Sequence, residues 1–187
     1  MKYKSSNEDK TVNRRQCTIS DAMIDLLVRQ LQHEIYNHNL YRMFANWYAL
    51  HGLIVLEEYY KQRANEEKLH HDWIADYLND CDAEYTYPEI PKVTAVFENL
   101  VDPFELTVNQ EINTTNLIYD IVNLAMEEKD WMTWAWLMNE TPGKAMLVAE
   151  QREEEALSRT ALDIAQQDGS WLRKEKSIMN VYTNDVD

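Results

Sequence analysis

Apolar side chains recur along this chain at steps of three and four residues, the spacing of one face of an α-helix. Four long segments and a short one show this pattern. The first runs from Ser20, a predicted N-cap, through Tyr48, and the second from Leu53 through Tyr77. The third begins at Asp102 and Pro103, the predicted N-cap and first helical residue, and continues through Ala125. The fourth runs from Leu147 through Ile164, and the short segment from Trp171 to about Val181. We therefore expect four long helices and a short one at the C-terminus.

The connection between the second and third predicted helices is much longer than a tight turn. It covers about residues 80–102, has mixed polarity and contains Pro88 and Pro91. About 20 extended residues reach ~66 Å, whereas a helix of about 28 residues is ~42 Å long. The connection can therefore run the length of a bundle and make its second and third helices parallel. We predict an all-α, ferritin-like four-helix bundle with one long crossover and a short C-terminal fifth helix.

The composition agrees with a helical chain. Its 187 residues include three glycines and four prolines, far below the usual ~12%, which excludes a turn-dense β sandwich or barrel. Gly52, Gly143 and Gly169 lie too far apart for a phosphate-binding loop or a dinucleotide fingerprint. The predicted organisation is a flexible basic N-terminal tail at 1–19, the bundle at 20–168, and a short C-terminal helix and tail at 169–187.

The formal net charge of −15 is distributed unevenly. Residues 1–15 sum to +3, so the remaining 172 residues sum to −18, a body that repels nucleic acid and anionic membranes and attracts cations. No apolar run approaches the ~20 residues of a membrane span, and the N-terminus lacks a secretory pattern. Cys17 and Cys81 match no metal or redox spacing. We expect a cytoplasmic protein that binds neither nucleic acid nor membrane.

A glutamate interrupts the apolar face of every long predicted helix. The interruptions are Glu34 on the first helix, Glu67 on the second, Glu111 on the third, and Glu150 and Glu154 on the fourth. A single glutamate of this kind usually lies at the rim of a core. The same interruption on all four helices indicates one shared site inside the bundle.

The predicted heights of these carboxylates agree. Glu34 lies 17 residues before the turn near His51 and Glu67 lies 16 after it, so the two face each other in an antiparallel pair. Burying several carboxylates together is costly unless cations compensate their charge. His70 follows Glu67 by three residues and adds a nitrogen to the same helix face. Inward glutamates with a Glu-x-x-His motif in a bundle core form a di-iron or di-manganese site.

The same residues carry a resemblance to a known family. The stretch from about Leu31 to Asp168 resembles the bacterial non-haem ferritins in Glu34 with Tyr41 one heptad on, in Asn65-Glu66-Glu67-Lys68-Leu69-His70, in Glu111, and in Ala149-Glu150-Gln151-Arg152-Glu153-Glu154-Glu155. The resemblance implies that Glu34, Glu67 and His70 hold iron at one position of a ferroxidase centre. It further implies that Glu67 bridges to a second position, which Glu111 and Glu154 complete.

The resemblance also assigns the surroundings of this dinuclear centre. Tyr41 matches the family's catalytic tyrosine, Gln151 matches a glutamine beside the ligands, and Glu66, Glu150 and Glu153 match the ligands of a third iron position used in transit. The implied function is that of a ferroxidase and iron-storage protein, which oxidises Fe(II) with dioxygen or hydrogen peroxide. The product is stored as a mineral in a homo-oligomeric, 24-subunit shell. Iron is the implied cofactor, and no haem is expected.

One interval departs from the family pattern. Glu111 and Glu154 are 43 residues apart, about two helical turns more than in the bacterial ferritins. We assign the excess to residues 131–146. Within them we predict that Thr141–Gly143 interrupts the fourth helix, because a proline there cannot donate the helical hydrogen bond. Trp131–Met138 then forms a separate helical piece that packs against a neighbouring subunit.

Several related di-iron families carry a second Glu-x-x-His motif on the fourth helix. Here Glu150 is followed three residues later by Glu153, and Glu154 by Leu157. The missing histidine favours a ferritin site, which releases its iron, over the sites of bacterioferritins, rubrerythrins and di-iron oxygenases. Two alternatives stay open: another di-metal oxidase and an iron-free helical interaction protein. Iron content after purification, with and without added Fe(II), separates the last from the others.

Overall fold

The computed structural model describes residues 17–138 and 147–184, which contain six helices and no strand. The helices are α2 (Asp21–Leu50), α3 (Ile54–Asp80), α4 (Asp102–Glu128), α5 (Trp131–Met138), α6 (Leu147–Gln166) and α7 (Trp171–Asn184). The prediction of an all-α chain with a short helix at its C-terminus is confirmed. In the described part of the chain, no helix is both long enough and apolar enough to cross a membrane.

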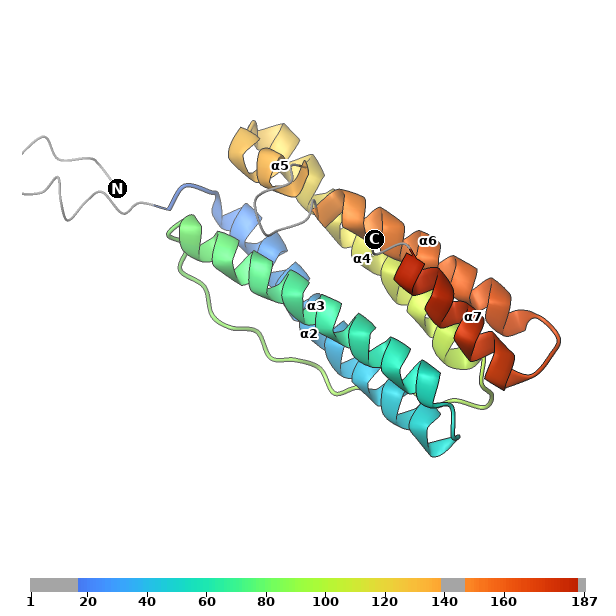
Figure 1. Cartoon of the computed structure of the whole chain (residues 1–187). Helices are drawn as coiled ribbons and strands as arrows, with labels where there is room; N and C mark the ends of the chain where they lie inside the picture. The colour runs from blue at the N-terminus through green and yellow to red at the C-terminus, as the bar shows by residue number, and fades with distance from the viewer. Residues whose placement is uncertain (1–16, 139–146, 185–187) are drawn as a thin grey trace, which may run out of the picture.

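The long helices form a four-helix bundle. α2 and α3 are an antiparallel pair joined by a short turn, and α4 and α6 form a second pair beside them (Figure 1). The connection between α3 and α4 follows the outside of the bundle from one end to the other (Figure 1). α3 and α4 therefore run in the same direction, which confirms the predicted long crossover.

The start of α2 is fixed by its predicted N-cap. The Ser20 hydroxyl accepts a hydrogen bond of 3.0 Å from the backbone N–H of Met23. The same hydroxyl donates one of 2.8 Å to the carboxylate of Glu128, the last residue of α4. Ser20 thus caps one helix and ties it to the end of another.

The start of α4 differs from the prediction. Its N-cap is Val101, and Asp102 is already helical with Pro103 in the first turn. The Asp102 carboxylate accepts hydrogen bonds of 2.6 and 3.1 Å from the backbone N–H groups of Glu98 and Asn99. Asp102 is therefore not the N-cap, because its side chain fixes the end of the crossover instead.

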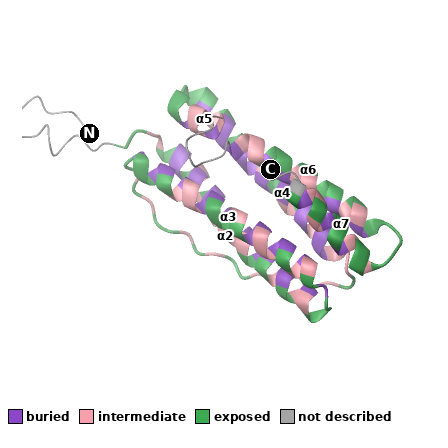
Figure 2. Cartoon of the chain, viewed as in Figure 1, coloured by how far each residue is buried: buried purple, intermediate pink, exposed green. Residues whose placement is uncertain are grey.

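Buried apolar side chains gather at the two ends of the bundle. The turn-end cluster, near the α2–α3 turn, includes Tyr48, Leu56, Phe104, Ala165 and Ile178. The far-end cluster includes Met23, Leu27, Ile74, Ile121 and Leu147. Buried residues face the interior of the bundle along each long helix (Figure 2). Between the two clusters, at mid-height, many of the buried residues are polar.

Helix α5 is a separate element, as predicted for Trp131–Met138. It begins two residues after Lys129, the C-cap of α4, which has the left-handed conformation with φ of 58°. Leu137 is buried and belongs to the far-end cluster, whereas Trp131 and Met132 are 61% and 78% exposed. The predicted break at Thr141–Gly143 lies outside the described residues. Packing of α5 against a neighbouring subunit stays a prediction.

Helix α7 packs back onto α3 and α6 (Figure 1). Ile178 and Tyr182 are buried in the turn-end cluster. Glu175 is also buried, and its carboxylate accepts a hydrogen bond of 3.1 Å from the backbone N–H of Val55 in the first turn of α3. The C-terminal helix therefore contributes to the bundle core.

Candidate metal centre

The space between the two apolar clusters holds the glutamates that interrupt the helical pattern. Glu34 on α2, Glu67 on α3, Glu111 on α4 and Glu154 on α6 are all buried, with at most 5% of their surface exposed. His70 lies one helical turn beyond Glu67 and is also buried. The helical spacing that placed these residues on inward faces thus brings them to one height in the bundle.

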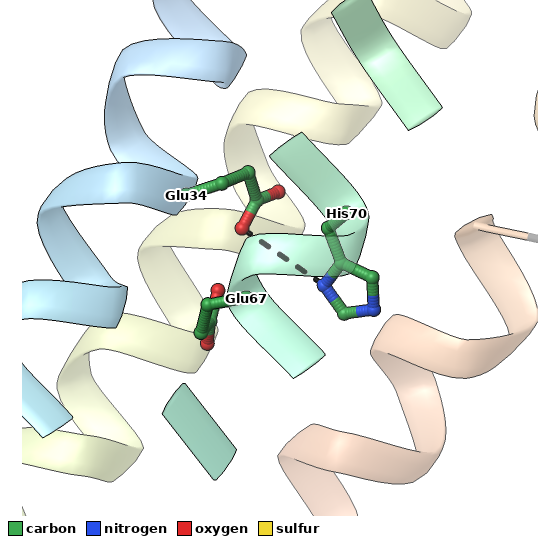
Figure 3. A group of neighbouring side chains, drawn as sticks. All are labelled: Glu34, Glu67 and His70. Atoms are coloured by element: carbon green, nitrogen blue, oxygen red, sulfur yellow. Dashed lines mark ion pairs between the residues drawn. The ribbon is translucent and has the colours of Figure 1, made fainter. Parts of the chain in front are cut away.

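These five residues form two groups that share one member. In the first group, ligand atoms of Glu34, Glu67 and His70 lie within 4.8 Å of one another. In the second, ligand atoms of Glu67, Glu111 and Glu154 do the same. Figure 3 shows the first group, with Nδ1 of His70 4.0 Å from Oε2 of Glu34. Glu67 stands between two sets of donors, the arrangement expected of a bridging carboxylate.

The donor atoms of the groups suit divalent cations. Oε2 of Glu34, Glu67 and Glu154 and Nδ1 of His70 are buried and have no hydrogen-bond partner among the described residues. Buried polar atoms normally have partners, and leaving one without a partner costs about 1–3 kcal/mol. Carboxylate oxygens with one imidazole suit first-row divalent metals such as iron and manganese. The residues therefore fit a pair of metal ions.

The ionisation of the centre reflects its crowding. Burial, together with the neighbouring charges of Glu34 and Glu111, raises the pKa of Glu67 well above its usual value. Burial also raises the pKa of Glu154 to about 8, although Arg63 and His70 oppose this shift. Burial disfavours a charged His70, yet the nearby carboxylates of Glu154 and Glu150 outweigh it and raise the pKa of this histidine to about 10. Without metal, the centre therefore retains protons at neutral pH.

Tyr41 and Gln151 both contact one ligand, Glu111. The buried phenol of Tyr41 donates a hydrogen bond of 2.5 Å to Oε1 of Glu111, and the amide of Gln151 donates one of 2.9 Å to Oε2. Burial raises the pKa of Tyr41 well above its usual value, so the phenol is neutral. The two residues together fix the orientation of the Glu111 carboxylate. Both had been predicted beside the ligands.

The three glutamates predicted for a third iron position do not meet in one group. The metal-ligand groups in the described residues include none of Glu66, Glu150 and Glu153. Glu66 is half-buried and accepts a hydrogen bond from the Tyr182 hydroxyl of α7. Oε1 of Glu150 lies 3.4 Å from Nε2 of His70, and Glu153 is exposed. Glu150, like Glu66, is half-buried.

Arg63 is a member of the centre that the sequence pattern did not predict. Its side chain is 1% exposed, and its guanidinium lies 2.6 Å from Oε1 of Glu111 and 3.2 Å from Oε1 of Glu154. A signal was present, because Arg63 precedes Glu67 by four residues and so shares its helix face. Gln30 was missed in the same way, although it precedes Glu34 by four residues. It is buried, and its side-chain amide donates a hydrogen bond of 2.5 Å to Oε1 of Glu34.

Comparison with known proteins gives consistent matches over most of the chain. A family model described as a ferritin-like domain matches residues 24–164. A bacterial non-heme ferritin of Campylobacter jejuni is 30% identical over 145 residues, which cover 78% of this chain and 83% of that protein. One from Staphylococcus saprophyticus is 29% identical with the same coverage.

Solved structures agree with these sequence matches. An open pore ferritin from the archaeon Archaeoglobus fulgidus superimposes with a TM-score of 0.77 at 26% identity, covering 87% of this chain and 98% of that one. A ferritin of Chlorobium tepidum superimposes with a TM-score of 0.73 at 28% identity, covering 80% of this chain and 87% of that one. The likeness extends over both helix pairs and therefore over the whole candidate centre.

Proposed function

This chain belongs to the ferritin-like domain family, and from that membership we propose that it is a ferroxidase and iron-storage protein. It oxidises Fe(II) to Fe(III) at a dinuclear carboxylate site and sequesters the product as a mineral inside a hollow oligomer. The observation that carries the proposal is the pair of ligand groups that share Glu67. An iron-free interaction protein has no need to bury four carboxylates at one height.

The proposal gives each ligand a role. Glu34, Glu67 and His70 hold the first iron, and Glu67 bridges to the second, which Glu111 and Glu154 complete. Hard anionic oxygens stabilise Fe(III) more than Fe(II), so this ligand set lowers the cost of removing an electron. Two Fe(II) ions together release two electrons, which is the number needed to reduce dioxygen to hydrogen peroxide or hydrogen peroxide to water.

Tyr41 is proposed as the catalytic tyrosine beside this pair. Its neutral phenol can supply a further electron during oxygen reduction, and the Glu111 carboxylate at 2.5 Å is placed to take the phenolic proton. The protein groups around the centre thus provide both an electron source and a proton acceptor next to the second iron.

Glu66, Glu150 and Glu153 are proposed to carry iron away from the centre through a third iron position. The support is their graded exposure: Glu66 and Glu150 are half-buried beside the ligands, whereas Glu153 is exposed. Carboxylates arranged in this way offer successive oxygen ligands to a cation that leaves the interior.

Storage of a mineral requires a closed cavity, which one subunit cannot enclose. We infer a homo-oligomer, a 24-subunit shell as in the resemblance, with Fe(II) and dioxygen or hydrogen peroxide as the small-molecule partners. Iron is the only cofactor proposed, without haem, and the proposed location is the cytoplasm. The exposed apolar pair Trp131 and Met132 supports contact between subunits.

The bridging role of Glu67 provides the test. Anaerobic Fe(II) titration of the wild type should reach two ions per subunit, and Glu67→Ala should abolish both because each group loses a donor. Glu34→Ala should retain partial occupancy of the second position. Glu58→Ala is a matched control, because Glu58 lies on the same helix and is exposed. Two irons retained in soaked crystals of Glu67→Ala would contradict the assignment, and no Fe(II) uptake by the wild type would refute the function.

A further inference from the structure

Arg63 is a cation buried inside a site that is proposed to bind cations. Among the described residues it is the only lysine or arginine in the buried core. Burying an unpaired guanidinium would be strongly unfavourable, so its position depends on the carboxylates that surround it. Those carboxylates belong to Glu111 at 2.6 Å, Glu154 at 3.2 Å and Glu66 at 3.3 Å.

The contacts of Arg63 fall on one half of the centre. Glu111 and Glu154 are the two ligands that belong only to the second group. Oε1 of Glu111 accepts hydrogen bonds from the Arg63 guanidinium and the Tyr41 hydroxyl. Its Oε2 accepts one from the Gln151 side-chain amide. Both oxygens of this carboxylate are therefore already bound by protein donors.

The first group differs in that Arg63, in the described part of the structure, forms no ion pair with Glu34 or His70. Oε2 of Glu34 and Nδ1 of His70 have no hydrogen-bond partner among the described residues. A metal ion entering there must displace the proton of His70, but within residues 17–138 and 147–184 it meets no arginine or lysine side chain on these ligands. A metal ion entering the second group meets a positive charge already held by two of its three ligands, and like charges at such short range repel strongly.

We propose that the Arg63 guanidinium is a resident cation at the second metal position, which a divalent ion must displace. This inference rests on the proposed function, because it assumes that the two groups bind metal. The first ion then binds at Glu34, Glu67 and His70, and the second binds more weakly because it competes with Arg63. The residue stabilises the metal-free centre and sets the order in which the two positions are loaded.

The structure also provides a place for the displaced side chain. Nη1 of Arg63 already contacts Oε2 of Glu66, which is 26% exposed and lies on the outer side of the centre. On withdrawal from Glu111 and Glu154, the guanidinium can retain this carboxylate and gain solvent. Glu66 thus offers Arg63 a partner that is not a member of either metal-ligand group.

Titration calorimetry with Zn(II), which cannot be oxidised, tests the inference on the assembled metal-free protein. The wild type should bind one ion tightly and a second at least tenfold more weakly. Arg63→Met keeps the length of the side chain but removes its charge, and it should tighten the second step at least tenfold. The melting temperature of the metal-free variant should fall. Arg159→Met is the matched control, since Arg159 is 54% exposed and pairs with Glu155, and it should change neither step.

Crystals of the wild type soaked at increasing Zn(II) concentration give a readout that does not depend on the folding of a variant. Anomalous density should appear first at Glu34, Glu67 and His70 with Arg63 still on Glu111, and the second peak should appear together with a displaced Arg63. The inference would be overturned if both positions filled equally at the lowest Zn(II) concentration while Arg63 stayed in place. It would also be overturned if folded Arg63→Met bound its second Zn(II) as weakly as the wild type. Either result would leave the ferroxidase proposal intact. If neither the wild type nor Arg63→Met bound Zn(II) or Fe(II), the inference and the ferroxidase proposal would both be overturned.

Discussion

At the scale of single residues, Tyr41 allows metal binding and redox chemistry to be separated. Tyr41→Phe removes the hydroxyl that donates to Glu111 but leaves all five proposed metal ligands. We expect unchanged iron binding, a loss of stability of about 1 kcal/mol for the lost hydrogen bond, and altered oxidation kinetics after the first two irons per subunit. Stopped-flow absorbance measures this, with Tyr119→Phe, an exposed tyrosine, as the control. Identical traces for Tyr41→Phe and wild type would refute the redox role.

The protonation of the centre predicts how the stability of the metal-free protein depends on pH. The pKa of His70 rises from 6.5 to about 10 on folding, and that of Glu154 from 4.5 to about 8. In both cases the folded state binds the proton more tightly, so the stabilisation is complete below the unfolded pKa and is lost as pH rises through the folded one. We expect the free energy of unfolding to fall between about pH 4.5 and 8 through Glu154 and between about pH 6.5 and 10 through His70.

Denaturant titration of the metal-free protein at several pH values checks this expectation. Glu154→Gln should flatten the slope, because the variant lacks one of the two titrating groups. Added Zn(II) should reverse the trend, since metal ligands must lose their protons and metal binding therefore strengthens with pH. A metal-free protein whose stability rises over the same interval would contradict the protonation state described above.

The sequence could predict site residues that interrupt the apolar face of a helix. It could not predict a site residue whose type is common on helix surfaces. Glu34 and Glu111 could be predicted because a carboxylate on the apolar face of a helix is unfavourable unless it has a function or a partner. Arg63 was not, because an arginine on a helix normally extends its charge into water along an apolar stem. Only the three-dimensional contacts with Glu111 and Glu154 show that its charge remains inside.

At the scale of helices, α7 is the element whose attachment can be tested directly. Ile178 is buried in the turn-end cluster with 1% exposure, whereas Leu172 on the same helix is 61% exposed. Ile178→Ala should cost about 2–5 kcal/mol of stability, and Leu172→Ala should change it by less than about 0.5 kcal/mol. Chemical denaturation measures both. Equal effects of the two substitutions would show that α7 does not pack on the bundle as described.

The helices and the crossover could be predicted more completely than their ends. Apolar periodicity and the reach of an extended linker are sufficient to fix four helices and the direction of α4. The N-cap was misassigned because Asp102 had two sets of backbone donors within reach, those of its own helix and those of Glu98 and Asn99. The packing of α7 could not be inferred, because an amphipathic helix fits its own bundle or a neighbouring subunit equally well.

At the scale of the whole molecule, the start of α5 is the place where assembly can be perturbed without touching the metal centre. Trp131 and Met132 are exposed neighbours in the chain, and exposed apolar patches commonly mark contact surfaces. Replacing both by glutamate should reduce the size of the oligomer in analytical ultracentrifugation. Zn(II) binding should remain as in the wild type, because neither side chain reaches the ligands. An unchanged sedimentation coefficient would exclude this surface from the assembly.

The crossover divides the chain into two hairpin-like halves, and this division has a consequence for the order of folding. The three donors proposed for the first metal position all lie on α2 and α3, at most 36 residues apart in the sequence. Those proposed for the second position are up to 87 residues apart and come together only when the α4–α6 half docks. The entropy of closing a loop grows with its length, so the two positions differ in contact order as well as in ligands. A metal ion at the first position thus stabilises the α2–α3 hairpin by itself. A metal ion at the second position stabilises only the complete four-helix bundle.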